Sequence, residues 1–345
     1  MKCVRVGIVG AGLAGTHRAR VVHADTDAQL VAVCDVEHAH AEETAMRWGV
    51  PDCRVTTDWM EVVNDAVDVV VVSTVHKFLA PITIAALHAG KDVLCEKPLG
   101  RSVVEAREMV KAACEAGRLL KTGFNHRYYP ALQRAHRLLW DGVIGEPMYL
   151  RVVYGHGGRP GYEREWRMDA DLAGGGQVLD QGVHALDLAR WFLGEYDRVF
   201  SRLTTDFWEV APLEDNAFTI LWTGDGKTAF LHTSVTQWRN RFDFEVYGKD
   251  GYLRIEGLGK SYGVGRLTLG KRLPQGGPPD ETYWEFPGED DSWSAEWADF
   301  TAALREGRHP LGDGEDGLRT MELTDAIYRS SCSGASVGVH RTDNH

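Results

Sequence analysis

The segment from Cys3 to Gly15 reads CVRVGIVGAGLAG, and it decides the fold of the first half of the chain. The apolar residues 3–9 predict a β-strand, and the glycines that follow open a predicted helix. In the pattern GxGxxG, Gly10 permits a tight turn, Gly12 lets the backbone approach a pyrophosphate, and Gly15 permits close packing of the helix. We therefore predict a dinucleotide-binding turn whose helix N-terminus faces the phosphates. The alternative is a glycine-rich turn that binds no nucleotide.

The end of the second predicted strand, residues 29–34, indicates which dinucleotide is bound. Asp35 follows this strand, 20 residues after Gly15. A carboxylate at this place accepts hydrogen bonds from both hydroxyls of the adenosine ribose. It also repels a 2′-phosphate, and the neighbouring Val36 and Glu37 supply no compensating cation. We therefore predict NAD as the cofactor, with NADP disfavoured.

Strands and helices alternate through residues 1–125, which predicts an α/β fold with a doubly wound parallel sheet, the Rossmann arrangement. The valine-rich residues 67–72 have the composition of a central strand covered on both faces. Residues 126–345 carry longer, more alternating strands joined by turns such as Gly224-Asp225-Gly226. They predict an α+β domain with a large, mostly antiparallel open sheet. We therefore predict a cofactor domain, 1–125, and a domain for substrate binding and oligomerisation, 126–345.

The other expected elements follow from the same patterns. A helix is expected to begin at Ser102 with a capping box, in which the side chain of Glu105 reaches back, and to end at Gly117. The remaining predicted helices are residues 13–24, 39–48, 80–89, 132–140, 294–305 and 318–331. The remaining predicted strands are residues 92–95, 119–122, 148–154, 216–222, 227–235, 242–247 and 252–255.

Composition narrows the class of protein. The 345 residues carry a formal net charge of −12 and no cluster of Lys and Arg, which disfavours nucleic acid as a partner. Six cysteines lack CxxC spacing, so we predict reduced thiols in a cytoplasmic protein. The apolar start is interrupted by glycines and followed by basic residues, unlike a signal peptide. No stretch is long and apolar enough to span a bilayer.

Polar residues follow two of the predicted parallel strands, at the edge where such sheets bind ligands. Ser73 and Thr74 end the valine-rich strand, where they contact a nicotinamide ribose or simply cap the strand. Lys97 follows the strand 92–95, and a cis bond to Pro98 would fix the direction of its side chain. The alternative is a solvated lysine. The residues predicted from these patterns to bind the cofactor are Gly10, Gly12, Leu13, Ala14, Gly15, Asp35, Ser73, Thr74 and Lys97.

The run GGGQVLDQGVH, residues 174–184, carries a candidate proton-transfer pair. Asp180 and His184 are four residues apart at the start of a predicted helix, hence on one face. The carboxylate can orient the imidazole and leave its other nitrogen to take a proton. The three glycines would let the backbone approach a small polar substrate. The alternatives are a helix-capping Asp with a packed His, or a metal site; without clear further ligands we predict no metal.

These motifs together resemble the Gfo/Idh/MocA oxidoreductase family. The resemblance rests on the GxGxxG start, Glu96-Lys97-Pro98, and the three glycines before Asp180 and His184. The segments 123–127 and 316–328 extend it over essentially the whole chain. It implies oxidation or reduction of a hydroxyl-bearing carbon on a sugar, inositol or related polyol with NAD(H) or NADP(H). It also implies a homo-oligomer, a dimer or tetramer, formed through the sheet of the second domain.

Carried over from the family, Lys97, Asp180 and His184 are the expected catalytic residues. Lysine side chains ordinarily titrate near 10.4 and histidines near 6.5, so we expect His184 to be the base and Lys97 to polarise the substrate oxygen. Asp180 is expected to stabilise the imidazolium. Glu96 and His76 are also expected at the cofactor, although His76 stands where the family often has asparagine, and Leu79 where it often has histidine.

Aromatic and polar residues after the cofactor domain form an expected substrate wall, and Lys97, Asp180 and His184 are expected to contact the substrate as well. The candidates are Asn125, Arg127, Tyr154, His156, Arg159, Tyr162, Trp166 and Arg167, each with a surface or packing role as the alternative. Arginines there would suit a phosphate or carboxylate, which keeps open the alternative of a reductase acting on a keto-sugar, with or without a linked nucleotide. A third reading is a cofactor-binding sensor without chemistry; the presence of Lys97 with Asp180 and His184 argues against it.

Overall fold

The computed structural model describes residues 3–341, and these form two compact units. The first unit consists of Met1–Phe124, Asp171–Gly174 and Trp293–Met321. The second consists of Asn125–Ala170, Gly175–Ser292 and Glu322–His345. This differs from the expected pair of contiguous domains, because two segments beyond residue 126 return to the first unit. The physical reason is apolar packing, since Trp297 and Phe300 are buried in the core of the first unit.

The first unit is built on a parallel sheet, which confirms the predicted α/β class. Among the described residues the sheet has six strands in the order β3-β2-β1-β4-β5-β6, the order of a Rossmann fold. Its central strand consists of four valines that are fully buried, as predicted for a strand covered on both faces. The elements are β1 (Val4–Val9), α1 (Leu13–Ala24), β2 (Ala28–Cys34), α2 (His38–Trp48), β3 (Arg54–Thr56), α3 (Trp59–Asn64), β4 (Val69–Val72), α4 (His76–His88), β5 (Asp92–Cys95), α5 (Val103–Ala116) and β6 (Leu120–Thr122).

Two local details of this unit show where the structure agrees with the sequence prediction and where it differs. The helix α5 begins and ends as predicted, because the Ser102 hydroxyl accepts from the Glu105 amide at 3.2 Å and Gly117 adopts the left-handed conformation. The reciprocal half of the capping box was wrong, however. The Glu105 carboxylate accepts from the amide of Arg101 and pairs with the Arg101 guanidinium instead. The short β3 and α3 were not predicted, since three residues are too few for a periodic signal.

The second unit is built on the predicted, mostly antiparallel sheet. Among the described residues it has nine strands in the order β14-β13-β12-β11-β7-β10-β9-β8-β15, and only the pair of β7 and β10 is parallel. The strands are β7 (Pro147–Gly155), β8 (Tyr196–Thr204), β9 (Asn216–Thr223), β10 (Thr228–Ser234), β11 (Arg241–Gly248), β12 (Gly251–Glu256), β13 (Gly265–Lys271), β14 (Asp280–Phe286) and β15 (Val337–Gly338). Of these, β8, β13, β14 and β15 were not predicted.

The helices of the chain after residue 125 are mostly short around the middle of the second unit and long towards the end. They are η1 (Asn125–Tyr128), α6 (Pro130–Trp140), η2 (Tyr162–Arg164), η3 (Trp166–Met168), α7 (Ala170–Ala173), η4 (Val178–Gly182), α8 (Val183–Leu193), η5 (Lys260–Tyr262), α9 (Ser292–Glu306) and α10 (Gly314–Ser333). Of these, η4 is a π-helix and α7 is a single α turn. The elements η1, η2, η3 and η5 are 3₁₀ turns, and the remaining four are longer α-helices. α9 belongs almost entirely to the first unit, and α10 is divided between the two.

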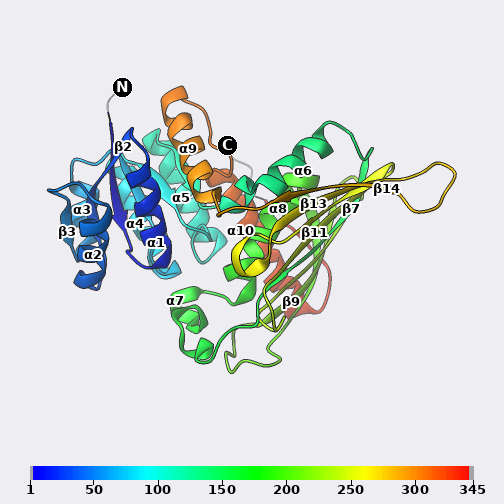
Figure 1. The fold of residues 1–345 in the computed structure, drawn as a ribbon. Coiled ribbons are helices and arrows are strands. Elements are labelled where there is room, and N and C mark those ends of the chain that lie inside the picture. The colour runs from blue at the N-terminus through cyan, green and yellow to red at the C-terminus, as the bar shows by residue number, and fades with distance from the viewer. Residues whose placement is uncertain (1–2, 342–345) are drawn as a thin grey trace. The chain divides into compact units, whose positions relative to one another are not determined.

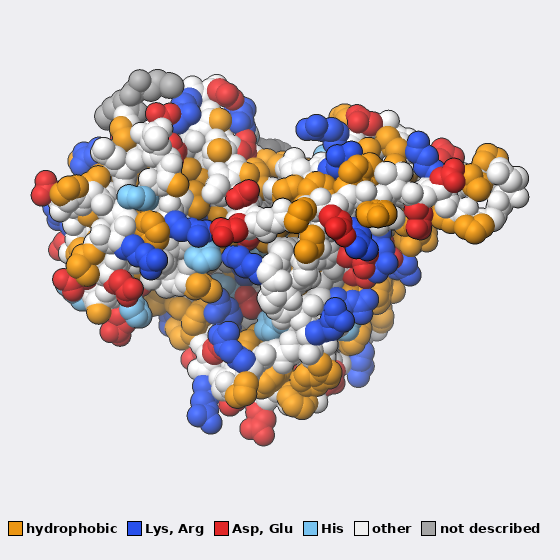
Figure 2. Space-filling view, in the orientation of Figure 1, with side chains coloured by type: hydrophobic (Ala, Val, Ile, Leu, Met, Phe, Trp, Pro, Cys, Tyr) orange, Lys and Arg blue, Asp and Glu red, His pale blue; other side chains and the backbone are white. Residues whose placement is uncertain are grey.

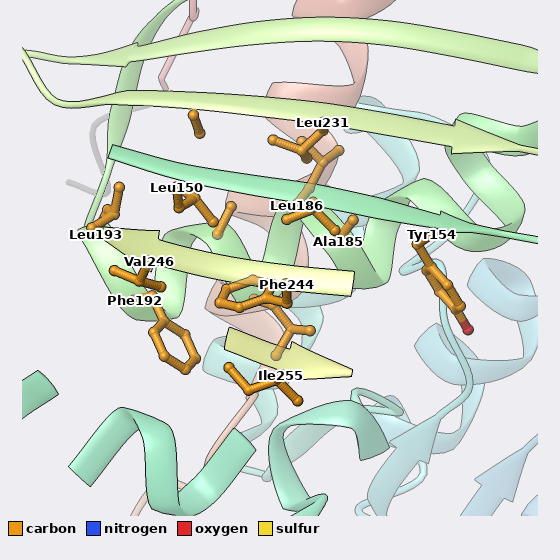
Figure 3. Close-up of a cluster of buried hydrophobic side chains, with 14 of the residues drawn as sticks. Leu150, Tyr154, Ala185, Leu186, Phe192, Leu193, Leu231, Phe244, Val246 and Ile255 are labelled. Atoms are coloured by element: carbon orange, nitrogen blue, oxygen red, sulfur yellow. The ribbon is translucent and has the colours of Figure 1, made fainter. Parts of the chain in front are cut away.

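The core of the second unit lies between one face of the nine-stranded sheet and the helices α6 and α8 (Figure 1). Buried and exposed residues alternate along β9, β11 and β12, as expected for a sheet covered on one side. Figure 3 shows Leu186 and Phe192 of α8 against Leu150, Leu231 and Phe244 of the strands. The same sheet therefore leaves its other face to solvent.

The surface and the helices carry two further properties. Figure 2 shows acidic and basic side chains mixed over the face in view. Within residues 3–341, no helix is long and apolar enough to cross a membrane.

Candidate active site

The glycine-rich turn of the first unit has the backbone geometry that dinucleotide binding requires. Gly10 has φ +96°, and a side chain there would strike the carbonyl of Ser73. Gly12 caps α1, and a Cβ added to it would meet no atom within 4 Å. The turn thus presents an open cradle at a helix N-terminus, where the backbone can approach an anion. These residues fit the pyrophosphate of NAD.

Asp35 stands beside this cradle, at the end of β2. Its Oδ2 accepts from the amide of Ala11 at 2.6 Å, and its Oδ1 accepts from the amide of Glu37 at 3.0 Å. A carboxylate oxygen can accept more than one hydrogen bond, so both oxygens of Asp35 can still accept from ribose hydroxyls. Asp35 therefore fits the predicted ribose contact, and it also ties the glycine turn to β2.

The polar residues after β4 are bonded to the backbone of their own unit. The Ser73 hydroxyl donates to the carbonyl of Gly10 at 2.7 Å, and the Thr74 hydroxyl donates to the carbonyl of Val75 at 3.1 Å. The imidazole of His76 is buried, with Nδ1 2.9 Å from the carbonyl of Ala173. Ser73 thus shapes the glycine turn. A direct ribose contact from these three side chains stays a prediction.

Glu96 differs from its expected role at the cofactor, because its carboxylate belongs to a buried ion network. Glu96 Oε1 lies 2.6 Å from Nη2 of Arg18, and Nη1 of Arg18 lies 2.6 Å from Glu296. Glu296 also pairs with Lys121 at 3.1 Å. These four residues are at most 7% exposed, so charge pairing replaces the lost hydration of their side chains. Glu96 therefore anchors the turn that carries Lys97, whose bond to Pro98 is cis.

In the second unit, Asp180 and His184 lie in one helical segment that changes type between them. Asp180 is in the π-helix η4, and His184 is in the first turn of α8. The prediction of a regular helix was therefore wrong at Asp180, because a π turn rotates its residues relative to the α-helix that follows. The Asp180 carboxylate lies 3.5 Å from Nε of Arg167, and the His184 ring stacks on His126. Both Asp180 and His184 are buried.

Three tyrosine hydroxyls surround this segment. Gln181 donates to the hydroxyl of Tyr262 at 3.3 Å, and Gln177 donates to that of Tyr162 at 2.9 Å. Burial raises the pKa of Tyr154, Tyr162 and Tyr262, and the charge of Asp180 raises each further. The three groups therefore stay protonated at neutral pH. The segment combines a carboxylate, an imidazole and hydroxyl donors, a set suited to a molecule rich in hydroxyl groups.

The chain is similar to known proteins along most of its length. The family described as "Oxidoreductase family, NAD-binding Rossmann fold" matches residues 4–124, and the "GFO/IDH/MocA C-terminal domain" matches residues 132–254. The 1,5-anhydro-D-fructose reductase of Ensifer adhaerens is 30% identical over 81% of this chain and 82% of its own length. The inositol 2-dehydrogenase of Rhizobium meliloti (strain 1021) is 28% identical over 97% of this chain and 99% of its own length. A levoglucosan dehydrogenase solved with NADH and L-sorbose superposes with a TM-score of 0.89 over 99% of this chain and 100% of its own, at 23% identity.

The chain belongs to the Gfo/Idh/MocA oxidoreductase family. It is an NAD-binding oxidoreductase, which confirms the predicted cofactor, enzyme class and fold. The sensor reading is therefore not retained.

Within this family member, the three glycines before η4 do not have the predicted role. A side chain at Gly175 would strike the hydroxyl of Tyr328, and one at Gly176 would strike the backbone of Glu214. The amide of Val178 donates to the Glu214 carboxylate at 2.9 Å. The glycines therefore make room for neighbouring protein groups, which fix the start of η4. Sequence reasoning missed Glu214, whose only sequence signal is a carboxylate just before a strand.

The predicted substrate wall separates into two groups. Arg127 was predicted to contact substrate, but its guanidinium is buried in a two-bond pair with Asp187 of α8, at 2.8 and 2.6 Å. It therefore fixes η1 to α8. Arg159 pairs with Glu165 at 2.7 Å. Asn125 is buried and donates to the hydroxyl of Ser292 at 2.9 Å.

The other wall candidates lie around Asp180. Arg167 packs its guanidinium over the ring of Trp166, 4.5 Å from the centroid. The ring of His156 meets that of Tyr162 edge on, and its Nδ1 accepts from the amide of Gly158. Burial lowers the pKa of His156, although the charge of Asp180 opposes this. These four residues remain predicted substrate contacts. Sequence reasoning assigned no role to His126, although it lies in the family-like segment 123–127, and it missed Tyr262.

Proposed function

We propose that the protein oxidises a hydroxyl-bearing carbon of a sugar or cyclitol with NAD⁺. The observation that carries this proposal is the buried segment from Asp180 to His184, which offers a carboxylate and an imidazole among hydroxyl donors. The names of relatives agree with it, since they include an inositol dehydrogenase and an anhydrofructose reductase. A polyol substrate would match the many hydrogen-bonding groups of this segment.

The proposed roles follow from the chemistry of each side chain. His184 takes the proton of the substrate hydroxyl, and Asp180 stabilises the imidazolium that results. Lys97 donates a hydrogen bond to the same oxygen, where negative charge develops as the proton leaves. Bound NAD⁺ would supply the hydride acceptor, so that the alcohol becomes a carbonyl and the products are NADH and a proton. Arg167, Tyr162, His156 and Trp166 orient the remaining hydroxyl groups.

The test is a direct assay of hydride transfer. Purified protein is mixed with NAD⁺ or NADP⁺ and with inositols, aldoses and sugar acids, and the absorbance of reduced nicotinamide is followed. We expect turnover with at least one polyol and NAD⁺, and loss of that turnover in His184→Ala. Silence across the panel with intact NADH binding, or full activity in His184→Ala, would contradict the proposal.

The reverse reaction is a second candidate, because one relative with 30% identity is named a reductase. Reduction of a keto-sugar would use the same residues, with His184 as proton donor. A phosphate-bearing substrate is less favoured than it was from sequence, because Arg127 and Arg159 are paired with carboxylates. Oxidation of NADH by keto-sugars, with no reaction of the alcohols, would favour this direction.

We also propose that the protein is a homo-oligomer, a dimer or tetramer, that buries the open face of the nine-stranded sheet. Residues opposite one another in neighbouring strands lie on the same face of a sheet. One such row mixes aromatic side chains with charges of both signs, which a second copy can complement: Phe200, Ile220, Phe230, Arg151, Glu245, Arg254, Thr268 and Tyr283. Light scattering should give a multiple of 38.3 kDa. Phe200→Glu with Phe230→Glu should give the monomer, whereas Phe207→Glu, on an exposed loop, should not.

A cytoplasmic location is the last part of the proposal. All six cysteines are free, and burial raises the pKa of the Cys34 and Cys95 thiols to about 12. Unpaired thiols suit a reducing compartment. Fractionation of cells that produce the protein would test this directly.

A further inference from the structure

A chain of hydrogen bonds in the second unit leads to His126, a histidine to which the sequence analysis assigned no role. Asp290 Oδ1 accepts from the hydroxyl of Ser292 at 2.5 Å, and that hydroxyl accepts from Nδ2 of Asn125 at 2.9 Å. Oδ1 of Asn125 lies 3.1 Å from Nδ1 of His126, and Nε2 of His126 lies 3.0 Å from the hydroxyl of Tyr154. The chain therefore runs from a carboxylate at the start of α9 to both nitrogens of one imidazole.

The direction of every bond in this chain follows from its first member. A carboxylate only accepts, so the Ser292 hydroxyl donates to Asp290 and must accept from Asn125. The amide nitrogen of Asn125 is thereby assigned, and its oxygen faces His126. Nδ1 of His126 must then carry a proton, and we assign Nε2 as the acceptor of the Tyr154 hydroxyl. His126 is accordingly held as the neutral ring with the proton on Nδ1.

Tyr154 is suited to keep that ring neutral. Its ring is 5% exposed, and Figure 3 shows it at the edge of the apolar cluster with its hydroxyl pointing away from Leu186 and Phe244. Burial, together with Tyr262, Tyr129 and Asp180, raises the pKa of Tyr154 well above its ordinary value. The hydroxyl therefore remains a donor over the working range of an enzyme.

The neutral ring lies face to face with the proposed base. The centroids of His126 and His184 are 3.8 Å apart, with an angle of 24° between the planes. The edge of Tyr129, 5.3 Å away, and the ring of Phe242 enclose His126 from other sides. A positive charge on His126 at this distance would oppose a second positive charge on His184.

We propose that His126 is a positioning residue for His184. Its ring is the platform on which the imidazole of His184 stacks, and its fixed neutral state lets His184 accept the proton of the substrate. This inference rests on the proposed role of His184 as the base. Tyr154, Asn125, Ser292 and Asp290 act through His126, because they fix its tautomer and deny it a second proton.

The proposal has a consequence for pH dependence. The titratable groups that face the stacked pair are Tyr154 and Tyr129 beside His126, Tyr262 and Asp180 beside Tyr154, and Asp290 at the far end of the chain. The hydroxyl of Tyr154 faces the basic nitrogen of His126. Loss of that donor would let His126 bind a proton, and the charged ring would weaken His184 as a base. Activity would then fall at a higher pH than in the wild type.

The test compares pH profiles of kcat in the full-length protein with its best polyol and saturating NAD⁺. Tyr154→Phe should move the acid limb to higher pH by about one unit. Adding His126→Phe, which keeps a flat ring but has no basic nitrogen, should return the limb to its wild-type position although the rate is reduced. An unmoved limb in Tyr154→Phe, or a shift that persists in the double variant, would overturn the proposal.

A second variant keeps the proposal testable if Tyr154→Phe does not fold. Ser292→Ala removes the link between Asn125 and Asp290, which frees the amide of Asn125 to turn its nitrogen toward His126. An N–H facing Nδ1 opposes protonation of His126, so we expect the acid limb not to move to higher pH, and a move to higher pH would overturn the proposal. His184→Ala separates the two levels of the account. If His184→Ala retains turnover, the proposed base is wrong. If His184→Ala is inactive and the acid limb of Tyr154→Phe does not move, only the role of His126 is wrong.

Discussion

The two units stabilise their buried polar groups in different ways. In the first unit, Arg18 and Lys121 are buried against Glu96 and Glu296, so charge is matched by opposite charge. In the second unit, His126 is held between an amide and a tyrosine hydroxyl, so its neutral state is matched by neutral hydrogen bonds. The first arrangement fixes a cation near the end of β5, and the second holds the ring of His126 against the imidazole of His184. We infer that the first unit supplies a positive charge and that the second supplies the proton acceptor.

The largest expected effect is on turnover. Lys97→Ala should lower kcat by about 10³-fold, which corresponds to about 4 kcal/mol of lost transition-state stabilisation. The affinity for NADH, measured by fluorescence titration, should stay within a few-fold of the wild type. Lys77→Ala is the matched control, since Lys77 is a half-exposed lysine paired with Asp171. If Lys97→Ala keeps most of its rate, the first unit does not supply the catalytic cation.

The next effect is on folding. Arg18→Met leaves the carboxylates of Glu96 and Glu296 without their shared partner, so the free energy of unfolding should fall by about 3–5 kcal/mol. Arg305→Ala breaks an exposed pair with Asp27 and should cost about 1 kcal/mol or less. Urea denaturation of both variants checks this. Equal losses would mean that the buried network contributes no more than a surface pair.

A smaller effect concerns the choice of cofactor. Asp35→Ser should raise the ratio of kcat/KM for NADP⁺ over NAD⁺ by about 10- to 100-fold, because a hydrogen bond to a charged group contributes about 1.5–3 kcal/mol. Glu37→Ser removes a carboxylate two residues away and should change the ratio little. The reverse order of the two variants would show that Asp35 does not select the cofactor.

The smallest expected effect concerns how much stability the protein loses at acid pH through a histidine of the second unit. Burial lowers the pKa of His136, whose ring stacks on Trp191. A lowered pKa means that the unfolded chain binds the proton more tightly, so stability is present above about pH 6.5 and is lost as pH falls below it. His136→Gln should reduce the fall of Tm between neutral and acid pH by about 1–3 °C. The exposed His38→Gln serves as the control, and a fall of Tm unchanged in His136→Gln would contradict this prediction.

The same contrast between the units explains which elements and site residues could be predicted from the sequence. The glycine turn, Asp35 and the strand ends of the first unit are close to one another in the sequence, and their spacing follows from strand and helix geometry. Most of the regular strands and helices were predicted to within a few residues, because their apolar periodicity is strong. Most of the site in the first unit could therefore be predicted from the sequence.

Less of the second unit could be predicted, because its polar contacts join segments that are distant from one another in the sequence. The ring of His126 meets Tyr154 and His184 only after η1, β7 and α8 have packed together, and no local spacing marks this. The pair of Arg127 with Asp187 arises in the same way, and it turned a predicted substrate contact into a link between η1 and α8. The π turn at Asp180 is likewise fixed from outside, by bonds from its backbone start to Glu214.

The central proposal is that Lys97 and His184 act in one chemical step. The most direct test compares kcat for Lys97→Met, His184→Ala and the double variant with the same polyol and NAD⁺. Residues that act as a unit give strongly non-additive losses. We predict that the double variant is no slower than the slower single variant. Losses that multiply would show that the two residues act independently, and would contradict the account.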